Sequence, residues 1–192
     1  MPLRLLTFIA LLLPTLYLSY QFIFNKLGAN PVEALTHQTG KWALISLLLS
    51  LSITPTIRFT RYKKLMLIRR TTGLYAFYYA SLHLLIYAVF DQSLSLQFLW
   101  EDVIDRPYIT LGFSAWLMLI PLTVSSTQNM RRRMGKRWVQ LHKLVYVIAI
   151  VVIFHYLWLI RVDYTEVVPY ALWLVILLGY RLAKLIPKWA KP

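Results

Sequence analysis

Six long apolar stretches divide this chain and constrain its fold more than any other feature. They cover residues 5–24, 38–57, 72–90, 108–127, 138–160 and 167–186. The second apolar run is itself shorter, Trp42–Ile57, and reaches a spanning length when it is extended to Gln38. A helix rises about 1.5 Å per residue, so about 20 residues cross a hydrocarbon core about 30 Å thick. Because no stretch alternates apolar and polar residues as a barrel strand does, we predict an all-α integral membrane protein: one domain, 1–192, with six transmembrane helices.

The first apolar stretch could be mistaken for a signal peptide, because Arg4 precedes it. It is longer than the apolar region of a signal peptide, however, and no clear small-x-small cleavage pattern follows it. We therefore expect residues 5–24 to be retained as the first transmembrane helix. The chain contains no cysteine, which excludes disulfides, thiolate metal sites and a cysteine nucleophile.

Charged residues are distributed unevenly between the two ends of the predicted bundle. With six spans, alternate connections lie at the same end, and one end carries seventeen of the 21 basic residues and no acid. Twelve of the seventeen lie in two segments, Arg58–Arg70 and Arg131–Lys143. The opposite end carries all seven acids, which are Glu33, Asp91, Glu101, Asp102, Asp105, Asp163 and Glu166. Since basic connections remain in the cytoplasm, we predict that both termini are cytoplasmic.

The formal net charge of +14 also raises the question of nucleic-acid binding, because RRRMGKR (Arg131–Arg137) resembles a basic patch. A topology signal, together with attraction to anionic lipid headgroups, explains the same residues. The GxGxxG and GxxxxGK[ST] patterns of nucleotide-binding folds are absent from the sequence. We therefore predict membrane lipid, and no nucleic acid, as the partner of this basic surface.

Two of the four histidines are predicted to lie at the same depth in the membrane. His83 lies about 12 Å before Asp91, at the outer end of the third helix, and His155 lies about 9 Å before Arg161, at the outer end of the fifth. A histidine that faced lipid would leave its ring nitrogens without partners, so both rings should face the bundle interior. Two imidazoles at matched depth on parallel helices can supply both axial ligands of a haem, which then transfers electrons instead of binding oxygen.

The other two histidines allow more than one interpretation. His142 lies about 20 Å below His155 on the same helix, and it is either a ligand of an inner haem or a structural residue. On an ideal helix the two rings face nearly opposite ways, so a bulge or bend would be needed to direct both at one neighbouring helix. His37 lies at the outer mouth of the second helix, where we expect a capping or solvated role. A helix–helix hydrogen bond is the alternative role for His83 and His155.

Four segments together resemble one family of membrane proteins. They are LGANPVEALTHQTGKWAL (Leu27–Leu44), RRTTGLYAFYYASLHLLIY (Arg69–Tyr87), DRPYITLGFSAWLMLIPLTVSST (Asp105–Thr127) and GKRWVQLHKLVYVIAIVVIFHYLW (Gly135–Trp158). In this order they resemble the MsrQ family (formerly YedZ), the haem-binding membrane subunits of the periplasmic protein-methionine-sulfoxide reductase system. The likeness covers about residues 26–185. The family belongs to the ferric reductase-like transmembrane group, which also contains the NADPH oxidases.

This resemblance implies a function. Members of the family pass electrons from the quinone pool, or from a cytoplasmic flavin reductase, across the bacterial inner membrane. The acceptor is a periplasmic molybdopterin reductase of the MsrP type, which repairs methionine sulfoxide in oxidised envelope proteins. The family is described as carrying haem b and FMN. The resemblance therefore implies a multi-pass electron-transfer subunit, with the catalytic reduction of the sulfoxide on its partner.

The resemblance also implies which histidines hold haem. The NADPH oxidases have two histidines on the third helix and two on the fifth, the latter pair thirteen residues apart. His83 matches the outer ligand of the third helix, while His142 and His155 match both ligands of the fifth. Arg69 stands where the inner ligand of the third helix would be. The number of haems, one or two, is therefore left open.

No residue can be assigned to FMN from the sequence. The basic segments Arg58–Arg70 and Arg131–Lys143 offer partners for its phosphate or for an acidic flavoprotein. The FAD/NADPH domain of the oxidases is missing from the chain, so we expect reducing equivalents to arrive from quinol or from a separate flavin reductase.

Two other functions, and the location of the docking surface, are also considered. A transmembrane cytochrome of the b561 type would use another acceptor, but it would want paired histidines for two haems. A transporter or an intramembrane protease would carry no haem. For the acceptor we predict docking at the outer connection Trp100–Pro107, where Glu101, Asp102 and Asp105 would meet basic groups. The alternative docking surface lies around His37 and Lys41.

Overall fold

The structure, a computed structural model, describes residues 2–160 and 163–183. In this part of the chain every regular element is a helix. Six helical segments are long and apolar enough to cross a membrane, namely Pro2–Ile23, Pro31–Thr60, Arg69–Asp91, Pro107–Val124, Lys136–Leu159 and Tyr164–Leu182. They match the six predicted stretches one to one, which confirms the all-α, six-span fold. The predicted end of the sixth span (184–186), Arg161, Lys184, Lys188 and Lys191 lie outside the described residues.

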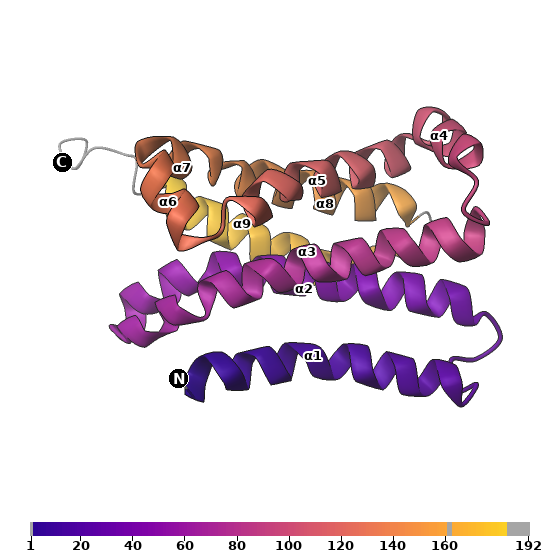
Figure 1. Cartoon of the computed structure of the whole chain (residues 1–192), viewed down its shortest axis with the longest axis horizontal. Helices are drawn as coiled ribbons and strands as arrows, with labels where there is room; N and C mark the ends of the chain where they lie inside the picture. Colours follow the sequence, from indigo (N-terminus) through magenta and orange to yellow (C-terminus); the bar gives the residue numbers. More distant parts are fainter. Residues whose placement is uncertain (1, 161–162, 184–192) are drawn as a thin grey trace.

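Two antiparallel helix pairs form the centre of the bundle. Helix α2 (Pro31–Thr60) packs along α3 (Arg69–Ile86), and α5 (Pro107–Val124) packs along α8 (Leu144–Leu159). Figure 1 shows the two pairs lying against each other, with α9 (Val168–Leu182) beside α2 and α8.

The largest apolar core lies between these helices. Leu48 of α2 and Ile148 of α8 are fully buried in it. Ala76 of α3, Ala115 of α5 and Ala149 of α8 are also buried there. Helices inside a membrane gain little from hiding apolar surface, so they associate where small side chains let the backbones approach closely. These three alanines supply such contacts.

Helix α1 (Pro2–Ile23) lies on the outside of the α2–α3 pair (Figure 1). It is attached by two tyrosines of α3, because the Tyr75 hydroxyl donates to Phe8 O (2.9 Å) and the Tyr79 hydroxyl donates to Leu11 O (2.6 Å). The rest of α1 is mostly exposed apolar surface, as a lipid-facing helix requires.

Short helices occupy the two ends of the bundle. At one end lie the 3-10 turn η1 (Lys63–Leu67), α6 (Gln128–Met134) and α7 (Lys136–Leu141), so both basic segments are at the same end, and α4 (Leu96–Asp105) lies at the other (Figure 1). The cytoplasmic location of the basic end stays a prediction of the positive-inside rule. A single π-helical turn, η2 (Tyr87–Asp91), extends α3, and the 3-10 turn η3 (Tyr164–Glu166) precedes α9.

The fifth span is not one continuous helix, although its sequence predicts one apolar stretch over residues 138–160. Helices α7 and α8 are separated by a turn at His142 and Lys143. At this turn the Lys143 N–H bonds to Gln140 O, three residues back, instead of to the carbonyl four residues back. The helix is therefore interrupted at the inner histidine, where a bend was expected if both histidines were to share a direction.

Candidate functional site

The structure brings His83 and His155 together. Their ring centroids are 6.2 Å apart and their planes are nearly perpendicular, at 83°. His83 comes from α3, which packs mainly on α2, and His155 comes from α8, which packs mainly on α5. The two imidazoles therefore face each other between the two helix pairs, and the matched depth expected from the sequence is confirmed.

A backbone carbonyl of the neighbouring helix holds each ring. His83 Nδ1 lies 2.8 Å from Thr36 O of α2, and His155 Nδ1 lies 2.6 Å from Tyr108 O of α5. A carbonyl oxygen can only accept, so each Nδ1 carries the proton and donates it. In both rings the lone pair is left on Nε2, which is the nitrogen available to bind a metal.

This pair fits a haem better than a bare metal ion. Among the described residues no group of three or more His, Cys, Asp or Glu side chains is placed to hold an ion, whereas protein sites for bare ions use about four or more ligands. A haem needs only axial ligands, because the porphyrin supplies the other four. Two metal–imidazole bonds of about 2 Å each, with the ring radii added, separate the centroids by about 6 Å, in agreement with the observed spacing.

His142 is held through the opposite ring nitrogen. Its Nε2 lies 3.0 Å from Ser125 Oγ, and its ring stacks on Trp138 with centroids 3.9 Å apart. The Ser125 hydroxyl is also 2.6 Å from Pro121 O, so its one proton is directed to that carbonyl and Nε2 of His142 is the donor. In this arrangement Nε2 of His142 offers no lone pair. Its role as an inner-haem ligand stays a prediction.

Arg69, the first residue of α3, occupies the position where a second inner histidine would be needed to pair with His142. It is partly buried and lies within electrostatic range of His142, Arg131 and Arg181. The described part of the chain pairs no carboxylate with it. The inner end is therefore an arginine cluster with one histidine, and it differs in chemistry from the outer histidine pair.

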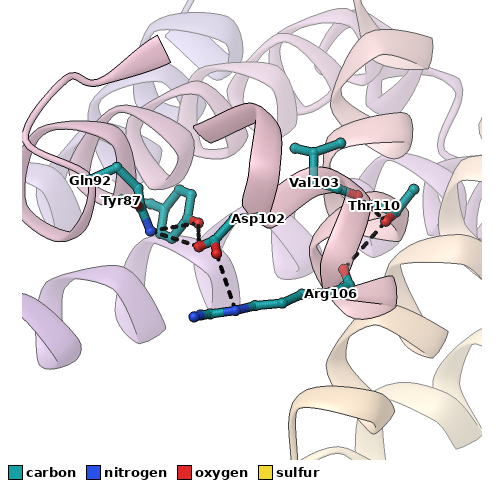
Figure 2. Close-up of polar contacts among 6 residues, drawn as sticks. All are labelled: Tyr87, Gln92, Asp102, Val103, Arg106 and Thr110. Atoms are coloured by element: carbon teal, nitrogen blue, oxygen red, sulfur yellow. Dashed lines mark hydrogen bonds and ion pairs between the residues drawn. The ribbon is translucent and has the colours of Figure 1, made fainter. Parts of the chain in front are cut away.

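The three acids of the predicted docking surface have different surroundings. Figure 2 shows the Asp102 carboxylate accepting hydrogen bonds from the Tyr87 hydroxyl and from Gln92 Nε2 (2.6 Å), and pairing with Arg106 Nε at 3.2 Å. The Asp102 side chain is only 14% exposed. It therefore joins α4 to the end of α3 and to the start of α5.

Glu101 and Asp105 are exposed on the same helix. Glu101 accepts a hydrogen bond from Gln97 (2.9 Å), also on the surface. These two acids remain available to a partner, whereas Asp102 is engaged inside the protein.

The alternative docking region around His37 and Lys41 is partly engaged as well. Lys41 of α2 pairs with Glu166 at 2.7 Å, and the Tyr156 hydroxyl donates to the same carboxylate at 3.1 Å. His37 is exposed, in agreement with the solvated role expected for it. The ion pair connects α2 to η3, and the hydrogen bond from Tyr156 adds α8, so the charges of Lys41 and Glu166 are largely balanced within the protein.

Sequence reasoning missed the groups that hold the two facing histidines. Thr36 and Tyr108 act through their backbone carbonyls, and every residue has a carbonyl, so the residue type gives no signal. Tyr87 was also missed, because its partner Asp102 lies on α4, a helix within a segment whose sequence predicts only a connection between two spans.

The chain resembles known proteins over most of its length. Residues 39–153 match the family described as the ferric reductase like transmembrane component. The heme-binding subunit MsrQ of the protein-methionine-sulfoxide reductase of Xanthomonas campestris is 42% identical over 181 residues, which is 91% of this chain and 83% of the relative. The subunit of the same name from Rhodospirillum rubrum is 43% identical over 180 residues, 93% of this chain and 86% of the relative.

No solved structure matches the chain. The family match covers more than half of its residues, and the identity to both relatives extends over almost the whole of it. Together with the six spans and the facing histidines inside the bundle, these similarities lead to one conclusion: the chain belongs to the ferric reductase-like transmembrane family and, within it, to the MsrQ group.

Proposed function

We propose that this protein is the haem b electron-transfer subunit of a protein-methionine-sulfoxide reductase system in the bacterial inner membrane. The observation that carries the proposal is the facing pair of His83 and His155, each with its Nδ1 proton bonded to a carbonyl and its Nε2 free. Relatives named as heme-binding subunits of such a reductase support the assignment.

The two histidines would hold one haem through their Nε2 atoms. A haem bound in this way supplies one-electron transfer. With both histidines bound to the iron, oxygen and other small ligands would find no open coordination site. Thr36 and Tyr108 orient the rings through their carbonyls.

His142 is the remaining candidate ligand. Ligation of a second haem through its Nε2 would require the contact with Ser125 to open, and Arg69 stands where a second histidine would be needed. We therefore propose one haem, held at the outer pair. The same two features argue against a b561-type cytochrome, which would need two histidine pairs.

The inner end is the proposed entry point of electrons. The donor is quinol or a cytoplasmic flavin reductase, and the arginines of α6 and α7 would attract an acidic flavoprotein. The FMN implied by the family would also find partners for its phosphate at this end, where Arg133, Lys136 and Arg137 line one shallow depression.

The outer end is the proposed exit. The acceptor is a periplasmic molybdopterin reductase of the MsrP type, which would form a heterodimer with this subunit and carry out the sulfoxide chemistry. The outer pair lies nearer to this side, and the exposed carboxylates of Glu101 and Asp105 could guide a partner with basic groups.

The experiment that tests this function uses the purified protein in detergent. We expect a b-type low-spin spectrum in the dithionite-reduced minus oxidised difference, with about one haem per chain. We also expect the reduced haem to be re-oxidised by the periplasmic reductase of the same bacterium, and to be stable without it under anaerobic conditions. A purified, folded protein without haem, or a haem that the reductase does not re-oxidise, would overturn the proposal.

A further inference from the structure

We propose that Gly40 and Gly112 are positioning residues of the haem site, because each leaves the opening through which a histidine reaches a backbone carbonyl of the next helix. The inference rests on the proposed function, since it concerns the same pair of imidazoles. It assigns a role to two glycines that neither ligate metal nor form a turn.

The opening is clearest at His155. Gly112 follows Tyr108 by four residues on α5, and in an α-helix the side chain four residues on lies over the carbonyl of the earlier residue. A Cβ built on Gly112 would lie 2.8 Å from His155 Cε1 and 2.9 Å from Nδ1. Real Cβ atoms essentially never approach other heavy atoms so closely. Any other residue at this position would therefore force the ring away from Tyr108 O.

The same construction recurs at His83. Gly40 follows Thr36 by four residues on α2, and His83 Nδ1 bonds to Thr36 O. A Cβ on Gly40 would lie 3.2 Å from His83 Nδ1 and 3.3 Å from Cε1. That contact is tight, but a shift of a few tenths of an ångström would relieve it. The two helix pairs thus hold their histidines in the same way, with the tighter fit at Gly112.

The other four glycines of the chain do not face an imidazole. A Cβ on Gly73 would meet only Ser50 Oγ, at an ordinary 3.5 Å, and a Cβ on Gly179 would meet nothing within 4 Å. Gly28 and Gly135 have positive φ angles, which explains them by backbone conformation. Gly73 and Gly179 therefore serve as matched controls on membrane helices.

Close contact with a glycine has two consequences for a haem ligand. It allows the Nδ1–carbonyl bond, which makes the imidazole a better electron donor and lowers the midpoint potential of the iron. It also fixes the plane of each ring, and the two planes here are nearly perpendicular. Perpendicular axial imidazoles give a low-spin ferric haem a strongly anisotropic EPR signal, whereas parallel ones give a rhombic signal.

The test compares four single variants with the parent protein, Gly112→Ala, Gly40→Ala, Gly73→Ala and Gly179→Ala. The readouts are the EPR spectrum of the oxidised haem and its midpoint potential in a redox titration. We expect the parent to show the anisotropic signal. Gly112→Ala should lose that signal or the haem itself, and Gly40→Ala should keep the haem with a changed signal and a potential shifted upward. Gly73→Ala and Gly179→Ala should match the parent in both readouts.

The outcomes distinguish failure of the positioning role from failure of the proposed function. If the Gly112→Ala variant does not accumulate in the membrane, the Gly40→Ala variant tests the positioning role by itself. Its steric clash is mild enough for the fold to accommodate. If the parent binds low-spin haem and Gly40→Ala and Gly112→Ala both match the two controls, the positioning role is wrong while the proposed function stands. If the folded parent binds no haem, the proposed function itself has failed.

Discussion

The two histidines of the fifth span are held in opposite ways, and the comparison shows what makes a histidine available as a ligand. At the outer end His155 donates from Nδ1 to a carbonyl and keeps the Nε2 lone pair, opposite a second histidine. At the inner end His142 contacts Ser125 through Nε2 and stacks on Trp138. Both positions carry the same residue type, but the ring nitrogen that the neighbouring groups engage differs.

The partner across the bundle differs as well. His155 meets His83, whereas the corresponding inner position of α3 carries Arg69, with further arginines nearby. A cluster of cations stabilises anions, such as phosphate, and destabilises the approach of another cation. The two ends of one bundle therefore differ in chemistry, with a pair of imidazoles at one end and a group of arginines at the other.

Removing either of the outer histidines should change haem binding more than any other substitution. His83→Ala or His155→Ala should each abolish most haem binding, because one imidazole is left to hold the iron. The measurement is haem per chain by pyridine haemochrome, with chain in the membrane fraction as the control for insertion. The pairing is wrong if both single variants keep the full low-spin spectrum.

His142→Ala tests the inner side of the comparison. We expect the outer haem spectrum to be intact and the free energy of unfolding to fall by about 1–2 kcal/mol, from the lost hydrogen bond and ring stacking. Redox titration with thermal unfolding in detergent measures both quantities. Loss of a separate redox component in this variant would instead establish His142 as the ligand of a second haem.

The acids of α4 offer a second comparison, between an engaged carboxylate and a free one. Asp102→Asn should destabilise the protein by about 1–3 kcal/mol, because Tyr87 and Arg106 lose a charged acceptor in a partly buried site. Glu101→Gln, on the exposed side of the same helix, should change stability little. Thermal unfolding of the two variants, side by side, gives the difference; equal midpoints would mean that the Asp102 network does not stabilise the outer end.

The exposed acids Glu101 and Asp105 should influence association with the partner rather than stability. Glu101→Gln combined with Asp105→Asn should leave haem content unchanged and slow re-oxidation by the periplasmic reductase several-fold at low salt, where screening is weakest. Stopped-flow re-oxidation at two ionic strengths measures this, with Glu33→Gln as an outer acid away from α4. Unchanged rates at both ionic strengths would move the docking surface to the region of His37 and Lys41.

The smallest effect is expected at the ion pair between Lys41 and Glu166. The Glu166 side chain is 57% exposed, and exposed ion pairs contribute about 0–1 kcal/mol. Glu166→Gln should therefore lower the free energy of unfolding by less than about 1 kcal/mol and leave the haem spectrum unchanged. A larger loss, in the same thermal measurement, would show that this pair holds α2 against η3 more strongly than its exposure indicates.

The sequence predicted the six-helix architecture of this protein because the position of each span depends on local composition. The length of an apolar run determines whether it can cross a bilayer, so all six spans were found. Counting residues from the charged ends of two spans placed His83 and His155 at one depth. Short features were missed: α4 is an amphipathic helix of only ten residues, and the break at His142 carries no proline or glycine.

Three properties could therefore be derived from the sequence: the number of spans, the end at which the basic residues gather, and the matched depth of His83 and His155. Three others became visible only in the folded protein. They are the ring nitrogen that each histidine uses, the internal position of Asp102 beside the exposed Glu101, and the contacts of Gly40 and Gly112 with imidazoles. The first group follows from composition and from the rise per residue along one helix. The second group depends on carbonyls and missing Cβ atoms of a neighbouring helix, whose rotation and distance are set by packing.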